Sequence, residues 1–254
     1  MKIIDRIVIW LDVTKSFVNT FWGIKANIVS SRETVEIILN EKKSLIRFGD
    51  GEFGIYRGKN IHYQSWSEQL KREFIEIKKD YEKQKEKSNF LLAVPKRFMS
   101  VPSWRLIKKR VYVSSWSQSR YDYKKEWNHS IRYGDSFLFE KKNKEIYGRL
   151  WNNNGTPKNI LFIHNDKKFS ELFAVTYNKK VEFIKCPMQN AYEKIDFLEN
   201  EVFKIIKKRN WDKNDVMVVV SAGPAGKILV YRLCKKNIWG IDTGHCWDDP
   251  LEGM

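Results

Sequence analysis

The chain has 254 residues, enough for one sizeable domain or a domain with a small appendage. Its hydrophobic fraction of 42% and charged fraction of 31% are those of a globular protein and exclude an intrinsically disordered chain. Lys and Arg number 47 against 31 Asp and Glu, a net charge of +16, which fits an anionic partner. A nucleic acid, an acidic membrane face and a phosphorylated small molecule all meet that description.

Cysteine usage and hydropathy favour a cytoplasmic protein. The three cysteines, Cys186, Cys234 and Cys246, are scattered and form no CxxC pair, which argues against a disulfide framework or a zinc site. The opening "MKIIDRIVIWLDV" lacks the long apolar core and cleavage site of a secretory signal. No stretch approaches the roughly 20 apolar residues of a membrane span.

Residues 1–30 are predicted to form an N-terminal amphipathic helical segment. Apolar residues recur with helical period, and Lys2, Arg6 and Lys15 lie among the polar positions. Such a helix can dock on the body of the protein or on a partner subunit of a homo-oligomer. It can also make a peripheral contact with the anionic inner face of the plasma membrane. The apolar positions are Ile3, Ile4, Ile7, Val8, Leu11, Phe17, Val18, Phe21 and Trp22.

Residues 31–254 are predicted to form a single α/β domain. Apolar strands alternate with helices, which is typical of a Rossmann-like fold with a mostly parallel sheet covered on both faces. Ser30 and Glu33 have the spacing of a helix capping box. Residues 96–135 carry no clear assignment. Strands are expected at 44–48, 89–95, 159–166, 180–187, 215–223 and 238–245, and helices at 30–43, 67–84, 144–151, 192–210 and 224–237.

The stretch "RFGDGE" follows the first of these strands and is expected to form a glycine-rich loop. Asp50 and Glu52, two residues apart on such a loop, can both reach one hard cation such as Mn²⁺ or Mg²⁺. Gly49 and Gly51 leave room for a ligand against the backbone, and Arg47 could pair with a phosphate. The alternative is an ordinary turn in which Asp and Gly have their usual turn roles.

A second candidate, "SAGPAGK", follows the most apolar strand and opens a helix. Gly223, Pro224 and Ala225 would lie at the positive end of the helix dipole. Gly223 and Ala225 offer backbone N–H groups there, whereas proline has none. That position favours an anion, although tight packing between strand and helix explains the glycines as well.

Two further strand ends carry polar side chains. "GIDTGH" brings Asp242 and His245 to the end of the last strand, and "HND" brings Asn165 to the end of a middle strand. His245 could bind a metal, donate to a phosphate, carry a proton or serve only as a structural residue. Because ligands bind beyond the carboxyl ends of parallel strands, we expect all of these segments on one rim.

Three segments resemble the motifs of GT-D-type glycosyltransferases. "ETVEIILNEKKSLIRFGDGEF" resembles their opening helix, strand and RxGDGE loop, and "IKCPMQNAYEKID" resembles a stretch with P-x-x-N-A-[FY]. "VVVSAGPAGKILVYRLCKKNIWGIDTGH" resembles their closing segment, which ends in D-x-G-H. The segments fall in order between Glu33 and His245. Where relatives carry an acidic and glycine-containing middle strand, this chain has "FIHNDKKFS".

The resemblance implies a Rossmann-like glycosyltransferase that uses a nucleotide-sugar donor, typically a UDP-sugar, and a divalent cation, commonly Mn²⁺. Asp50 and Glu52 would then serve the metal and the donor diphosphate, with His245, a further candidate metal ligand, and Asp242 in the same pocket and Arg47 as the leading arginine of the motif. The expected acceptor is a glycan, a glycoprotein or a lipid-linked sugar in bacterial surface glycan synthesis.

Other functions fit parts of the sequence. The same acidic pair could serve another metal-dependent phosphoryl or phosphodiester enzyme, and the positive charge could serve a non-catalytic protein that binds nucleic acid or another anion. No recognisable nucleic-acid motif is present, so nucleic acid is not the expected partner. An inverting transfer also needs a general base, for which Asp135, Asp248 and Asp249 are candidates.

Overall fold

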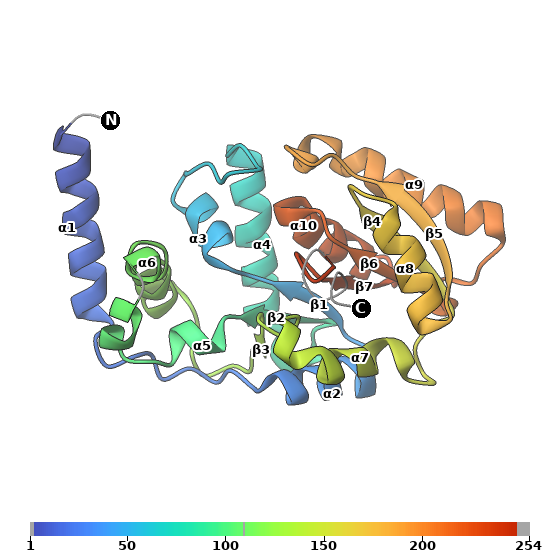
Figure 1. The fold of residues 1–254 in the computed structure, drawn as a ribbon, viewed down its shortest axis with the longest axis horizontal. Coiled ribbons are helices and arrows are strands. Elements are labelled where there is room, and N and C mark those ends of the chain that lie inside the picture. Colours follow the sequence, from blue (N-terminus) through green and yellow to red (C-terminus); the bar gives the residue numbers. More distant parts are fainter. Residues whose placement is uncertain (1–2, 109, 248–254) are drawn as a thin grey trace.

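A computed structural model of the chain describes the backbone of residues 3–108 and 110–247, and the side chains of residues 10–107, 113 and 115–247. Its centre is a sheet of parallel strands in the order β3-β2-β1-β7-β6-β4-β5 (Figure 1). The predicted α/β class and the parallel sheet are therefore confirmed. The strands are β1 (Ser44–Arg47), β2 (Phe90–Val94), β3 (Gly134–Asp135), β4 (Asn159–His164), β5 (Lys180–Lys185), β6 (Val216–Val220) and β7 (Trp239–Asp242).

The strand order brings the first and last strands together at the middle of the sheet. Leu45 of β1 pairs with Ile241 of β7, and Val220 of β6 pairs with Asp242 at the end of β7. The strands β1, β7, β6 and β4 thus lie side by side, although long stretches of sequence separate them. Every residue of β2 and β6 is buried, as expected for apolar strands covered on both faces.

Helices cover both faces of the sheet (Figure 1). Arg232 of α10 bridges Glu73 of α4 and Glu199 of α9, which places these three helices on one face. On the other face, the rings of Trp151 in α7 and Phe173 in α8 are in edge contact. The larger helices are α1 (Ile3–Asn19), α2 (Ser31–Asn40), α3 (Asp50–Tyr56), α4 (Glu68–Gln84), α6 (Arg110–Glu126), α7 (Lys144–Asn152), α8 (Lys168–Tyr177), α9 (Ile195–Arg209) and α10 (Gly223–Cys234).

Residues 50–56 form helix α3, so the loop predicted for "GDGEFG" is wrong. Gly49 is the N-cap in an extended conformation, and its N–H donates to Oε2 of Glu52 at 2.7 Å. This is the reciprocal half of a capping box, and acidic residues in the first turn also favour the helix dipole. Burial of Phe53 and Ile55 outweighs the low helix propensity of the glycines.

Residues 96–135, which carried no assignment, form three helical elements and a short strand. A short turn of helix, α5 (Lys96–Met99), is followed by a 3₁₀ segment, η2 (Ser103–Lys108), and by the long helix α6. The chain then joins the sheet edge as β3. Helix α6 is only weakly amphipathic because Ser, Gln and Arg occupy buried positions on it, which explains why hydrophobic periodicity did not reveal it.

The N-terminal segment forms helix α1, as its periodicity predicts, and α1 lies against α6 at one end of the molecule (Figure 1). Val13 and Ser16 are buried in this contact. The boundary expected at residue 30 stays a prediction. In the part of the chain that the structure describes, no helix combines the length and apolar character needed to cross a membrane.

Candidate active site

A cavity of about 1000 Å³ opens at the carboxyl ends of the central strands. Its lining includes segments that follow five strands, namely Gly49–Glu52 after β1, Asn165 after β4, Cys186–Gln189 after β5, Ser221–Gly223 after β6 and Thr243–Cys246 after β7. The prediction that the polar strand ends share one rim is therefore confirmed. A single ligand in this cavity can meet all of these segments.

The two acidic residues of the RxGDGE motif both line this cavity but differ in environment. Asp50 is exposed at its mouth, whereas Glu52 is only 5% exposed. A helix turns by about 100° per residue, so side chains two positions apart diverge by about 200°. The protein around Asp50 desolvates its carboxyl, and Glu52 adds like charge, so the pKa of Asp50 lies above its ordinary value.

Glu52 is held by Lys227, a residue to which the sequence analysis gave no role. The Nζ atom of Lys227 lies 3.4 Å from Oε1 of Glu52 and 3.4 Å from Oδ2 of Asp242, and it donates to the carbonyl of Gly223 at 3.1 Å. Burial alone would lower the pKa of the Lys227 ammonium, but the carboxylates of Asp242 and Glu52 outweigh it and raise the pKa above its ordinary value.

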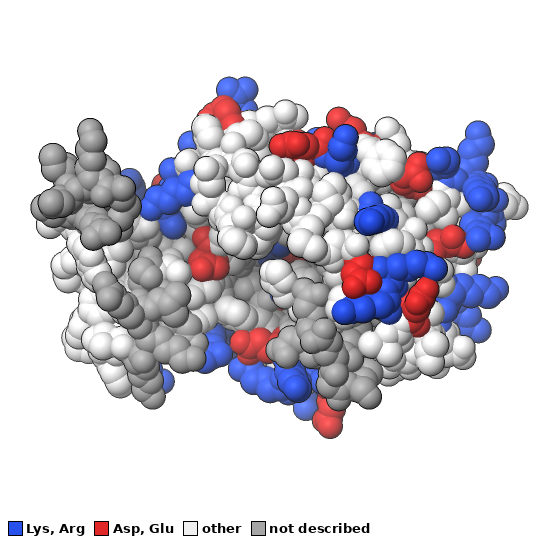
Figure 2. Space-filling view, turned by 45° about the horizontal axis from the view of Figure 1, so that its top comes forward, with Lys and Arg blue, Asp and Glu red and all other residues white. Residues whose placement is uncertain are grey.

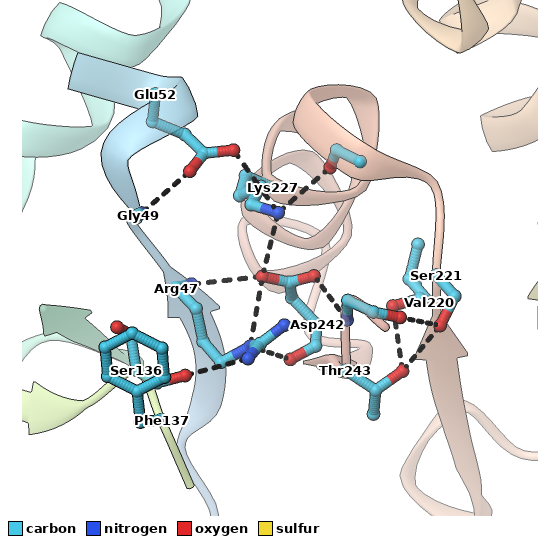
Figure 3. A network of polar contacts seen from close by, with 12 residues as sticks. Arg47, Gly49, Glu52, Ser136, Phe137, Val220, Ser221, Lys227, Asp242 and Thr243 are labelled. Atoms are coloured by element: carbon cyan, nitrogen blue, oxygen red, sulfur yellow. Dashed lines mark hydrogen bonds and ion pairs between the residues drawn. The ribbon is translucent and has the colours of Figure 1, made fainter. Parts of the chain in front are cut away.

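Asp242 lies beneath the cavity and does not line it. The residue is fully buried, and its Oδ2 accepts the backbone N–H of Arg47 at 3.2 Å (Figure 3). The Arg47 side chain donates from Nε to the carbonyl of Asp242 at 2.9 Å and from Nη1 to the carbonyl of Ser136 at 2.8 Å. Asp242 thus holds two cations in place, Arg47 at the end of strand β1 and Lys227 in helix α10.

The turn after β7 is shaped by a glycine that has no room for a side chain. Gly244 has φ +53°, and a Cβ atom there would overlap Nη2 of Arg47. Its carbonyl accepts the Ser221 hydroxyl at 2.6 Å, and Ser221 also bonds Thr243 at 2.9 Å. The glycine of the D-x-G-H motif therefore allows the Arg47 side chain to pass between the last strand and the cavity.

The predicted histidine and asparagine both line the cavity. His245 is exposed on the turn after β7, and its ring meets the edge of Tyr63 with centroids 5.9 Å apart. Asn165 is half-buried after β4, next to His164, whose Nδ1 accepts the backbone N–H of Asp166 at 3.0 Å. The two predicted side chains therefore enter the same cavity from different strands.

The predicted start of α10 divides between the cavity and the core. Gly223 lines the cavity with φ +53°, and a Cβ atom there would lie 2.6 Å from the Tyr63 ring. Pro224 and Ala225 are buried in the first turn of the helix and do not line the cavity. Of this motif, the cavity therefore meets mainly the segment Ser221–Gly223.

Sequence reasoning missed one side of the cavity. The loop after α3 contributes Arg57, Lys59 and Tyr63, and α6 contributes Trp116 and Gln118. These residues come from segments without a recognisable motif. Lys227 did leave a signal, because it is a cation between the small residues "GPAG" and the apolar run "ILV" of α10.

The loop after α3 is fastened by the segment that resembled a P-x-x-N-A-[FY] motif. Asn190 adopts a left-handed conformation, and its Oδ1 accepts the N–H of Ser65 at 2.8 Å. The N–H of Asn190 donates to the carbonyl of Tyr63 at 2.9 Å, and the N–H of Tyr192 donates to Gln64 at 3.2 Å. The motif thus fixes the wall of the cavity that carries Tyr63.

Of the candidate general bases, Asp135 is not among the residues that line the cavity. Asp135 ends β3, where its Oδ2 accepts from Ser31 at 2.9 Å and its Oδ1 from the N–H of Phe137 at 3.1 Å. Burial raises its pKa. Asp248 and Asp249 lie outside the described residues.

The oxygen donors of the cavity fit a hard divalent cation. Over the described residues, no three His, Cys, Asp or Glu side chains come together as a metal-binding group, so the protein offers mainly Asp50 and Glu52. A carboxylate has about four acceptor positions, so Glu52 retains capacity beside Gly49 and Lys227. Mg²⁺ and Mn²⁺ are commonly held by one or two carboxylates together with substrate phosphates.

Charges around the molecule are mixed in sign. Figure 2 shows Lys and Arg interspersed with Asp and Glu on the visible face, with the densest blue groups over the end where β5, α8 and α9 lie. The cavity lining contains the cations Arg47, Arg57, Lys59 and Lys227 beside the acids Asp50, Glu52 and Glu140. A diphosphate entering the cavity would therefore meet charges of both signs.

A family model and curated relatives both identify glycosyltransferases as the proteins that this chain resembles. The model of the glycosyltransferase GT-D fold matches residues 45–249. Glycosyltransferase GlyD of Streptococcus pneumoniae is 25% identical over 238 residues, 87% of this chain and 27% of that protein. The probable glycosyl transferase Gly of Streptococcus gordonii is 21% identical over 232 residues, 86% of this chain and 32% of that protein. The chain thus spans about a third of these relatives or less.

Solved structures share the fold. A selenomethionine-substituted domain of unknown function 1792 superposes with a TM-score of 0.71 at 21% identity, over 96% of this chain and 84% of that one. A structure described as a new glycosyltransferase of the same domain family from Streptococcus sanguinis gives 0.70 at 20% identity, over 89% and 84%. Since the family model matches well over half of the sequence, the chain belongs to the glycosyltransferase GT-D family.

Proposed function

We propose that the protein transfers a sugar from a nucleotide-sugar donor, a UDP-sugar in the first instance, to a glycan, glycoprotein or lipid-linked acceptor. Membership of the GT-D family favours a glycosyltransferase over the phosphoryl-transfer and anion-binding alternatives that the sequence left open. The observation that carries the proposal is the cavity in which Asp50, Glu52, His245 and the start of α10 meet.

In this proposal the donor diphosphate lies between the start of α3 and the turns after β6 and β7. Asp50 would hold Mn²⁺ or Mg²⁺ together with the donor phosphates, Glu52 would act on the ion directly or through water, and His245 is a further candidate ligand. Such an ion supplies positive charge that stabilises the leaving diphosphate as the glycosidic bond breaks. Lys227 holds Glu52 in position from below and adds a buried positive charge.

The Arg47 side chain has a positioning role in this proposal. Its Nε and Nη1 donate to the carbonyls of Asp242 and Ser136, and its guanidinium lies 5.2 Å from the centre of the Phe139 ring. Arg47 therefore fixes the turn after β7 that carries His245, and adds its charge to the cavity floor. The acceptor would enter beside Trp116 and Gln118, where the cavity is lined by an aromatic face and an amide.

Thermal denaturation with UDP and Mn²⁺ tests the proposal. Together they are expected to raise the melting temperature by several degrees, and Asp50→Asn is expected to abolish the increase. Glu171→Gln, a change at an exposed acidic residue of α8, is the matched control and should leave the increase intact. A panel of nucleotide sugars with Mn²⁺ then identifies the donor by its slow hydrolysis.

Two outcomes would contradict the proposal. One is the absence of any melting shift with every nucleoside diphosphate and divalent cation. The other is a product analysis that finds only free sugar phosphate or nucleoside monophosphate and no glycosylated acceptor, since that result indicates phosphodiester cleavage rather than glycosyl transfer.

A further inference from the structure

Helix α1 carries an exposed apolar face on the side away from α6. Exposed fractions are 49% for Trp10, 65% for Leu11, 64% for Val18 and 82% for Trp22, which follows the helix. With about 100° of rotation per residue, Trp10, Leu11 and Val18 fall within about 100° of one another around the axis. Large apolar side chains are therefore grouped along one face of an element at the end of the molecule (Figure 1).

Polar groups take part in the contact between the protein and the described part of α1 with the turn after it. Ser16 is 5% exposed and Thr20 is 1% exposed, while Arg120 of α6 is fully buried and donates from Nη2 to the Thr20 carbonyl at 2.7 Å. The Ser103 hydroxyl also donates to the Thr20 carbonyl at 2.9 Å. A helix on a water-soluble protein normally buries its apolar face and exposes its polar face. Among its described side chains, α1 exposes the large apolar residues Trp10, Leu11 and Val18 beside polar ones, and it buries only Val13 and Ser16.

The exposed apolar face continues onto the neighbouring 3₁₀ segment. The N–H of Ser103 donates to the carbonyl of Phe21 at 2.7 Å, which ties the start of η2 to the turn after α1. Beyond Ser103, Trp104 is 48% exposed and Ile107 is 62% exposed. We call Trp10, Leu11, Val18, Trp22, Trp104 and Ile107 together the outer face.

Exposed cations border the outer face. Lys15 lies on α1 with its Nζ 6.0 Å from the centre of the Tyr121 ring of α6, and Lys25 follows Trp22 by three residues. Arg105 lies over the Trp104 ring at 5.3 Å, and Nζ of Lys124 donates to the carbonyl of Asn19 at 2.6 Å. Asp12 is an exposed acid on the same helix, and its charge also acts on Lys59. These four cations against one acid make the surroundings of the outer face mainly positive.

We propose that the outer face lies on the surface of a bilayer that contains anionic lipid. Tryptophan is favoured at the boundary between headgroups and acyl chains, because one part of its ring system is apolar and its N–H is polar. Bordering Lys and Arg side chains are attracted to anionic headgroups. In an alternative two-fold dimer of this chain, the outer face would meet itself and bring its own cations together, which disfavours that occupant.

This orientation brings the cavity close to the lipid surface. Helix α6 contacts α1, and Ser115, Trp116 and Gln118 of the same helix line the cavity. One helix therefore separates the proposed membrane contact from the candidate active site. An acceptor held in the membrane by a lipid would have a short path to the cavity. This role for the acceptor rests on the proposed function, whereas the membrane contact itself does not.

Co-sedimentation with vesicles tests the membrane contact. The full chain is expected to sediment with phosphatidylcholine vesicles containing phosphatidylglycerol, and much less with pure phosphatidylcholine. The triple variant Leu11→Ser, Val18→Ser, Trp22→Ser is expected to lower the partition coefficient at least about tenfold. A matched control, Val175→Ser with Phe197→Ser, removes exposed apolar side chains on α8 and α9, which are 83% and 53% exposed, and should not change it.

Separate readouts distinguish failure of the membrane contact from failure of the proposed function. Circular dichroism should show that the triple variant keeps its helix content, and the melting shift with UDP and Mn²⁺ should be the same as in the parent chain. Equal sedimentation of the parent and the triple variant would overturn the membrane contact. The membrane contact would also be overturned if the parent chain did not bind anionic vesicles and instead formed a dimer that the triple variant does not form.

Discussion

Replacing Lys227 by methionine would remove the cation that links Glu52 and Asp242 while keeping a side chain of similar length. Both carboxylates are buried, at 5% and 0% exposure, and both lie 3.4 Å from the lysine Nζ. In the variant, two buried negative charges would face each other across the space of one ammonium group. The change therefore tests whether the lysine holds the floor of the cavity together.

The expected loss of stability can be estimated from these contacts. At an effective dielectric constant of about 20, a pair of unit charges 3.4 Å apart attracts by about 5 kcal/mol, much of which desolvation offsets. Removing one partner of a buried ion pair typically costs about 3–5 kcal/mol. Asp242 keeps Arg47, and Glu52 keeps the N–H of Gly49, so we expect the lower end of that range, about 3 kcal/mol.

Urea denaturation of Lys227→Met at several pH values measures this loss. Without the cation, two carboxylates remain buried beside each other, an arrangement that the uptake of a proton relieves. A folded protein with such groups binds more protons than its unfolded chain, so its stability increases as the pH falls. The deficit should thus shrink between pH 8 and pH 5. Lys235→Met is the matched control, since Lys235 is a half-exposed lysine just after α10 and its contact with Glu76 is at the surface.

The reasoning would be refuted by a deficit below about 1 kcal/mol that does not change with pH, the behaviour of a surface ion pair. A double variant with Glu52→Gln gives a second check. If the unpaired Glu52 charge causes part of the loss, adding Glu52→Gln to Lys227→Met should recover stability, whereas Glu52→Gln alone should reduce it.

Three further changes probe other features of the cavity. Gly223→Ala should destabilise the protein by about 1–3 kcal/mol, because φ is +53° and the new Cβ would lie 2.6 Å from the Tyr63 ring. Gly148→Ala, in a helix with open space around the glycine, should stabilise the protein by about 0.5–1 kcal/mol in the same urea assay. Asp50→Asn should raise the free energy of unfolding at neutral pH by less than about 1 kcal/mol, because the raised pKa of Asp50 means that its charge is disfavoured in the folded state. This gain should disappear below about pH 4, which thermal denaturation at several pH values will measure. Burial raises the pKa of the Cys186 thiol to about 11, so mass spectrometry should find it alkylated slowly at pH 8 in the native protein and rapidly in urea.

Much of the fold could be predicted because its strands are short apolar runs bounded by turn residues. The segment "VMVVV" can only be a buried strand in an alternating chain, and Ser30 with Glu33 forms the capping box that its spacing indicates. The rim could be predicted for a related reason. In a parallel sheet every strand ends at the same edge, so polar residues at strand ends meet there without any knowledge of strand order.

The partners of the site residues could not be predicted, because they depend on strand order and on distant segments. Lys227 reaches Asp242 only because β7 inserts between β1 and β6, an order that local patterns do not determine. The wall that carries Tyr63 depends on Asn190, more than a hundred residues away in the sequence. The role of helix α6 could not be recognised because the helix buries polar residues, such as Arg120, which donates to the Thr20 carbonyl.

The acidic pair of the RxGDGE motif divides its roles because it opens a helix rather than a loop. On a flexible loop, Asp50 and Glu52 would be interchangeable donors that turn toward one ion. On the first turn of α3, the N3 position of Glu52 places its carboxylate against the N–H of Gly49 and next to Lys227, whereas Asp50 at the first position stays at the cavity mouth. Glu52 is therefore oriented before any ligand arrives, and the charge that a ligand can neutralise is that of Asp50. Because the pKa of Asp50 is raised in the free protein, a cation that binds there relieves an unfavourable charge, so cation binding should release protons when the pH is near that pKa.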